Sequence, residues 1–157
     1  MDTLKFKPIY LGQCIIRYQV PLDIFTSINQ IYEQNYNSLA PANGQLVGKI
    51  EKEHSLFYHG EDQTKMKNHN FIPKNVTDYF MQVFNHYLKF NAIRDYKTHL
   101  NSIWVNEMKQ HEYNPAHIHR GMLYTGLSSV MILKLPSTYG KEYSAEHIQQ
   151  NGRLQIL

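Results

Sequence analysis

The spacing of the apolar residues changes once along the chain, and this change most strongly limits the fold. Before Asp95, apolar residues recur at helical spacing in two stretches, Leu22 to Ile31 and Val76 to Leu88. After Asp95, the segment HLNSIWVNEM alternates, with Ile103 and Val105 on one face. Helical spacing buries one stripe of a helix, whereas alternation buries one face of a strand. Helices followed by strands predict an α+β fold.

Three elements are expected before Asp95. Residues 3–20 mix aromatic and β-branched residues around Leu11-Gly12, which predicts two short strands joined by a turn. Pro21 is allowed in a first helical turn, so the first helix is predicted to begin there and to end between residues 35 and 37. A second helix is predicted from Pro73 to about Phe90. The residues of the first helix expected to face the core are Leu22, Phe25, Ile28 and Ile31.

Other segments are less regular. GQLVGKIEKEHSLF is predicted to be a loop with a short element of uncertain type, and residues 63–70 to be a mobile surface loop. Within LSSVMILKLP, residues 130–135 are predicted to form a buried strand that Pro136 ends. The closing NGRLQIL is predicted to be a turn and a further strand. His54, His59 and His69 follow no regular spacing and are expected at the surface.

The size and charge of the chain set its class. With 157 residues, 42% of them hydrophobic, one domain is expected over residues 1–157, with a strand-and-helix part at 1–95 and the first strands of a larger sheet at 96–157. The net charge is only +3 and the basic residues are scattered, which disfavours nucleic acid or an anionic membrane as partner. The single cysteine, Cys14, and the lack of a long apolar stretch favour a soluble, cytoplasmic protein.

Two histidines, His117 and His119, stand two positions apart in a segment that Pro115 biases toward extended backbone. In extended backbone both point to the same side, while Ile118 points to the core. Two neutral imidazoles on one face suit one divalent ion, at about 2.0 to 2.2 Å from each nitrogen. The chain carries nine histidines, so an ordinary solvated pair is the alternative.

The order of these features resembles a branch of the 2-oxoglutarate and Fe(II)-dependent oxygenases that is frequent in phages and marine bacteria and carries an H-x-H motif. The resemblance spans about residues 40–157. It rests on Trp104-x-Asn106, Pro115, His117-x-His119 and the apolar stretch ending at Leu135-Pro136, together with an upstream element at Leu46, Gly48, Ile50 and Glu51.

The resemblance implies a double-stranded β-helix, or jelly roll, with N-terminal helices packed on the sheet. It also implies Fe(II) as cofactor and 2-oxoglutarate as co-substrate, with hydroxylation of an unactivated C–H bond as the reaction. His117 and His119 would be two of the metal ligands. The family's distal histidine and the base that pairs with the far carboxylate of 2-oxoglutarate fall after a segment like NGRLQIL. The jelly roll is therefore expected to be incomplete at the C-terminus, as an N-terminal fragment or as a chain that a homo-oligomer or another chain completes.

Further roles follow from the same resemblance. Asn106 and Tyr124 would contact the 2-oxoacid. Apart from the resemblance, His111 and Glu112 stand near the pair in sequence and would lie behind the metal ligands, with Glu112 accepting a hydrogen bond from an imidazole N–H; a solvated turn is the alternative. The rival interpretation is a non-catalytic jelly-roll binding module, or a phage accessory or structural protein, whose histidines are incidental or hold a structural Zn²⁺. The substrate stays open.

Overall fold

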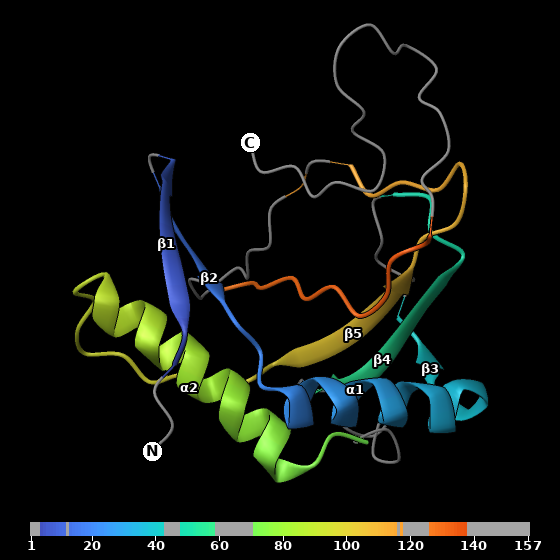
Figure 1. The fold of residues 1–157 in the computed structure, drawn as a ribbon, viewed down its shortest axis with the longest axis horizontal. Helices are drawn as coiled ribbons and strands as arrows, with labels where there is room; N and C mark the ends of the chain where they lie inside the picture. The colour runs from blue at the N-terminus through green and yellow to red at the C-terminus, as the bar shows by residue number, and fades with distance from the viewer. Residues whose placement is uncertain are drawn as a thin grey trace, which may run out of the picture. The chain divides into compact units, whose positions relative to one another are not determined.

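The computed structural model describes residues 4–11, 13–42, 48–58, 71–115, 117 and 126–137. The chain divides into two compact units, Met1–Pro115 and Ala116–Leu157. In the described part, every helix and strand belongs to the first unit, which holds two α-helices and two small antiparallel sheets (Figure 1). The predicted α+β class is confirmed.

The chain begins with a two-stranded antiparallel hairpin. Strand β1 (Phe6–Leu11) pairs with strand β2 (Gln13–Tyr18), in a register that places Phe6 opposite Tyr18 and Leu11 opposite Gln13. Both strands were predicted, and they confirm that the aromatic and β-branched residues on either side of position 12 favour extended backbone.

Two helices follow the boundaries expected from the sequence. Helix α1 (Leu22–Asn35) continues into a 3-10 turn, η1 (Tyr36–Ser38), and helix α2 spans Lys74–Phe90. The stripe predicted for α1 is partly wrong, because Leu22 is 77% exposed whereas Ile24 and Ile28 are buried. Ile24 and Ile28 are four residues apart and share one face, while Leu22 stands in the first turn and points to solvent.

The stripe predicted for α2 is confirmed. Val76, Tyr79 and Val83 recur at spacings of three and four, and they are buried together with Leu88. Val76 has no exposed surface, which makes it one of the two most completely buried large side chains of the described residues. Burial of this stripe, rather than local helix propensity, stabilises a helix of this kind.

The second sheet has three antiparallel strands in the order β3-β4-β5. They are β3 (Ala40–Pro41), β4 (Lys52–Tyr58) and β5 (Ser102–Glu107), and β5 confirms the strand expected in HLNSIWVNEM. Strand β4 corrects the prediction of a loop over this part of GQLVGKIEKEHSLF. Its buried side carries Glu53 and Ser55, so polar residues stand where a strand pattern needs apolar ones. The register shifts between Ser55 and Phe57, which breaks the alternation further.

The prediction of a buried strand at residues 130–135 is wrong for this structure. Residues 126–137 have no regular secondary structure, and Val130 is 63% exposed. Apolar and β-branched composition favours extended backbone, but a strand exists only when a neighbouring strand accepts its backbone hydrogen bonds. In the described part of the chain this stretch has no such neighbour.

The structure contains no helix, among the residues it describes, that is long and apolar enough to cross a membrane. The loop predicted at 63–70 and the turn and strand predicted in NGRLQIL lie outside the described residues, as do His59, His69 and Ile118.

Candidate functional site

Asn106 lies in strand β5, opposite Glu53 of β4. Its side-chain oxygen is buried and has no hydrogen-bond partner among the residues that the structure describes. A buried polar atom without a partner costs about 1 to 3 kcal/mol, so this amide oxygen is ready to accept a hydrogen bond or to ligate. The sequence predicted Asn106 as a contact of the 2-oxoacid. The oxygens of an ionised 2-oxoacid only accept hydrogen bonds, so the Nδ2 donor of Asn106, and not its oxygen, suits that contact.

The turn after β5 is held by the carboxylate of Glu112. One oxygen accepts the backbone N–H of Lys109 at 2.7 Å, and the other accepts the backbone N–H of Glu51 at 2.9 Å. Both hydrogen bonds lower the pKa of Glu112, and the one from Lys109 has the larger effect. Glu112 therefore fastens the turn to the chain that leads into β4, and its predicted bond to an imidazole stays a prediction.

His111 stands in the same turn with a φ of 66°, in the left-handed region that few residues other than glycine adopt. Its side chain is exposed. The turn thus presents His111 to solvent, and its predicted place behind the metal ligands also stays a prediction.

Gly48 is pressed against the segment that leads to the two histidines. Lys49 and Tyr113 exchange backbone hydrogen bonds, N to O, at 2.9 and 3.0 Å. A β-carbon at Gly48 would lie 2.3 Å from the backbone oxygen of Tyr113 and 2.9 Å from Pro115 Cδ. Only glycine fits this close approach. The upstream element of the resemblance is therefore packed directly on the residues just before His117-x-His119.

The two histidines themselves are described only in part. His117 belongs to the second unit and its side chain is exposed, whereas His119 and Tyr124 lie outside the described residues. Within the described ranges, no group of three or more His, Cys, Asp or Glu side chains is arranged to hold a metal. The structure therefore leaves the pairing of the histidines, and a third ligand, as predictions.

Two imidazole nitrogens, those of His117 and His119, are a type of ligand that Fe(II) accepts. Imidazole nitrogens suit Fe(II), as they suit Zn²⁺, Ni²⁺ and Cu²⁺. His117 and His119 alone bring no charge to such an ion, so a divalent ion held by them would need further ligands.

A second cluster of titratable side chains was not found from the sequence. It joins α1, η1, β4 and β5. The hydroxyl of Tyr32 donates to one oxygen of Glu107 at 2.7 Å, and that of Tyr36 donates to the other at 3.3 Å. The ammonium of Lys52 donates to the Tyr36 hydroxyl and lies 4.8 Å from the centre of its ring. His54 was expected at the surface, but it is half-buried and its ring lies edge-on to Tyr36, 5.0 Å between centres.

The geometry of this cluster fixes the proton on His54. A tyrosine hydroxyl has one hydrogen, and Tyr32 gives it to Glu107. His54 Nδ1 lies 3.0 Å from the same hydroxyl oxygen and must therefore supply the hydrogen of that bond. Burial, and next the hydrogen bond to Glu107, raise the pKa of Tyr32.

The signal that would have found the cluster is the spacing of Tyr32 and Tyr36. Residues four apart share a helix face, and both carry a hydroxyl at the tip of an apolar ring. A buried carboxylate is a natural acceptor for such a pair, but the sequence does not say that β5 brings Glu107 to this face.

No family model, curated protein or solved structure matched this chain.

Proposed function

We propose that this chain is part of an Fe(II)- and 2-oxoglutarate-dependent dioxygenase, with His117 and His119 as two of the metal ligands. The three-stranded sheet β3-β4-β5, with α1 bonded to it through Tyr32, is proposed to be one part of a jelly roll. The observation that carries the proposal is the close contact of Gly48 with Tyr113 and Pro115.

This contact supports the proposal because it links two parts of the resemblance that lie far apart in the sequence. The upstream element around Gly48 and the H-x-H segment were matched independently, by residue type alone. If the chain has the fold that the resemblance implies, these two segments are expected to lie side by side. The hydrogen-bonded bridge between Lys49 and Tyr113 is a contact of this kind.

Each residue has a definite task in the proposal. His117 and His119 hold the ion, and Asn106 and Tyr124 orient the 2-oxoacid. When bound, iron would supply activation of O₂, with 2-oxoglutarate converted to succinate and CO₂ while a C–H bond of the substrate is hydroxylated. Glu112 keeps the turn before the histidines in place through its two backbone hydrogen bonds.

The test is an anaerobic titration of the full-length protein with Fe(II) in the presence of 2-oxoglutarate. A chelated 2-oxoacid on iron is expected to give a weak visible charge-transfer band. Replacing both His117 and His119 by Ala is expected to abolish the band. His99→Asn is the matched control, since it also removes an exposed imidazole. A further variant, His111→Asn, tests the predicted place of His111 behind the ligands, and Asn tolerates the left-handed backbone of position 111.

The His111→Asn variant distinguishes a metal ligand from a residue that orients a ligand. Loss of the band with His111→Asn would make His111 a ligand, and a 10- to 100-fold weaker iron affinity, roughly, would match a residue that orients a ligand. A band that survives the double histidine substitution would refute the proposed ligands. Stoichiometric Zn²⁺ binding through both histidines, with no band from iron and 2-oxoglutarate, would support the non-catalytic binding module instead.

A further inference from the structure

The two faces of the β4-β5 strand pair differ in what they contact. Lys52 of β4 stands opposite Glu107 of β5. Glu107 accepts a hydrogen bond from Tyr32 of α1, so this pair of residues faces α1. Successive side chains of a strand point to opposite faces. The next pair along the strands, Glu53 and Asn106, therefore points to the face away from α1.

Glu53 and Asn106 place buried oxygen acceptors beside each other on that face. Residues directly opposite in an antiparallel pair have β-carbons about 4.5 to 5.5 Å apart. Glu53 is only 6% exposed, and it forms no ion pair with another described residue. The side-chain oxygen of Asn106 is buried and has no partner in the same part of the chain. Burial raises the pKa of Glu53, the shift expected where no cation compensates the charge of a carboxylate.

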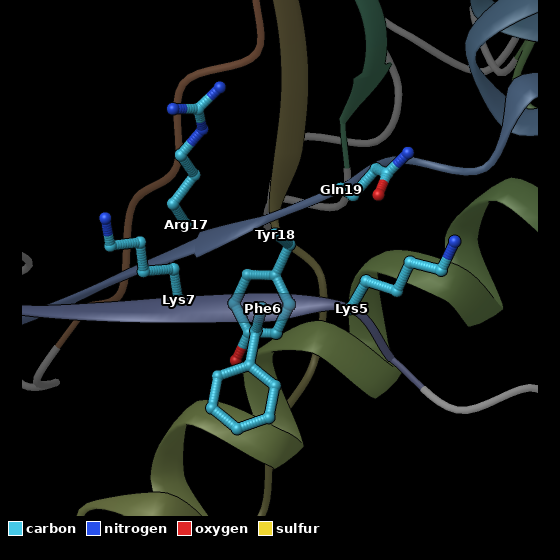
Figure 2. Close-up of a pocket in the computed structure, with 6 residues that line it drawn as sticks. All are labelled: Lys5, Phe6, Lys7, Arg17, Tyr18 and Gln19. Carbon is cyan, nitrogen blue, oxygen red and sulfur yellow. The ribbon is translucent and has the colours of Figure 1, made fainter.

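Cations of the same unit have other positions. Lys52 is next to Glu53 in sequence, but it points to the other face of the sheet and donates to the Tyr36 hydroxyl. Lys7 and Arg17 border a hollow of about 340 Å³ on the β1-β2 hairpin (Figure 2). These cations therefore leave the buried carboxylate of Glu53 without a compensating charge in the described part of the chain.

Trp104 keeps part of this face accessible. It lies two residues before Asn106 in β5, so its side chain is on the same face, and it is 37% exposed. The face of an indole ring attracts a cation through its negative π surface. An indole on the same face as the two acceptors therefore favours a positively charged group over a neutral or an anionic one.

We propose that Glu53 and Asn106 bind a primary ammonium group. The carboxylate offers two acceptor oxygens and the amide offers one, and a primary ammonium has three N–H donors and no acceptor. Its single positive charge equals the charge of one carboxylate. Ca²⁺ and Mg²⁺ take about six or more oxygen ligands, more than this pair supplies. The proposal does not depend on iron or on 2-oxoglutarate, because the 2-oxoacid would use the Nδ2 donor of Asn106 and leave its oxygen for the ammonium.

The test is isothermal titration calorimetry of the full-length protein with n-butylammonium, without added metal. Glu53→Gln keeps the size of the side chain but removes its charge, and it is expected to weaken binding by about tenfold or more, the effect of losing hydrogen bonds to a charged group. Glu33→Gln is the matched control, since it makes the same change at an exposed residue of α1, and it is expected to bind as tightly as the unchanged protein.

Two related ligands distinguish charge from hydrogen bonding. n-Butanol has the same alkyl chain without the charge, and n-butyltrimethylammonium has the charge without N–H donors. Both are expected to bind about tenfold more weakly than n-butylammonium or worse. A second primary ammonium, Nα-acetyl-lysine methylamide, identifies the source: tighter binding than n-butylammonium would support a lysine side chain of a protein, and weaker binding would support the ammonium of a small molecule.

Glu53→Gln also distinguishes loss of binding from loss of folding. It removes a buried charge, so its melting temperature without ligand is expected to rise or stay equal while binding is lost. If that variant folds poorly, Asn106→Leu removes the other acceptor and is expected to weaken binding in the same assay. Equal affinities of the Glu53→Gln and Glu33→Gln variants for n-butylammonium would overturn the proposal. Equally tight binding of n-butyltrimethylammonium would overturn it too, and so would Ca²⁺ binding through Glu53 with no binding of n-butylammonium.

Discussion

Removing the Tyr32 hydroxyl is expected to lower the free energy of unfolding by about 1.5 to 3 kcal/mol, the range for a hydrogen bond to a charged group. The bond to Glu107 is 2.7 Å long and joins α1 to β5. The same substitution leaves His54 Nδ1 without the oxygen that it now donates to. Because Tyr32 is only half-buried, the lower end of the range is expected. In a domain of this size that is a fall of roughly 3 to 6 °C in melting temperature.

A double-mutant cycle isolates the bond from other effects of the substitution. Tyr32→Phe, Glu107→Gln and the double variant are to be unfolded in urea, and a coupling energy of about 1 kcal/mol or more is expected between the two positions. Tyr36→Phe is the matched control. Its hydroxyl reaches the same carboxylate at 3.3 Å, so its coupling to Glu107→Gln is expected to be smaller, below about 0.5 kcal/mol.

The cycle also tests the proton assigned to His54. If the coupling between Tyr32 and Glu107 is near zero, the hydroxyl does not donate to the carboxylate, and the assignment of the hydrogen to His54 Nδ1 fails with it. A coupling of Tyr36 that equals that of Tyr32 would likewise contradict the argument, because it would mean that the shorter distance has no energetic weight.

Three further outcomes are expected. Gly48→Ala should lower the free energy of unfolding, measured in denaturant, by about 1 to 3 kcal/mol, because the new methyl group meets the Tyr113 oxygen. Lys49→Ala, at an exposed side chain, is the control and should change it by no more than about 0.5 kcal/mol. Equal stabilities of the two variants would contradict the close approach at Gly48. Tyr79→Phe removes a buried hydroxyl without a partner and should leave stability unchanged or raise it by about 1 kcal/mol, so a clear loss would reveal a missed bond. Burial raises the pKa of Tyr18 to about 12 from an ordinary value of 10.0, so the stability that its neutral hydroxyl contributes is complete below pH 10 and is lost as the pH rises toward 12. In unfolding curves measured at alkaline pH, Tyr18→Phe should therefore reduce this loss of stability. An unchanged loss in the variant would mean that another group causes it.

The sequence predicts the fold where one physical signal dominates. The buried stripe of α2 follows from the spacing of its apolar residues, and the hairpin strands follow from their aromatic and β-branched residue types. Strand β4 was missed because Glu53 and Ser55 occupy its buried side. The strand prediction for residues 130–135 was wrong for the opposite reason. Their composition favours a strand, but composition does not supply the neighbouring strand that a sheet requires.

The candidate site shows the same limit. Asn106 was predicted from a short motif, and the structure adds that its oxygen is buried and unpartnered. The bonds of Tyr32 and Glu107 were out of reach, because they depend on how α1 is placed against β5. Local patterns name the residues that carry chemistry, but the partners of each residue are set by contacts between segments far apart in the chain.

The separation of β4 from β5 in the sequence also sets an order of folding. Residues 59–101, including the whole of α2, stand between the two strands, so their pairing must close a long loop. The β1-β2 hairpin closes across a single residue and is expected to form within about 1 to 10 μs of the start of folding. During synthesis, β4 can pair fully with β5 only after residue 107 has left the ribosome. The hairpin would therefore exist before the sheet that carries Asn106.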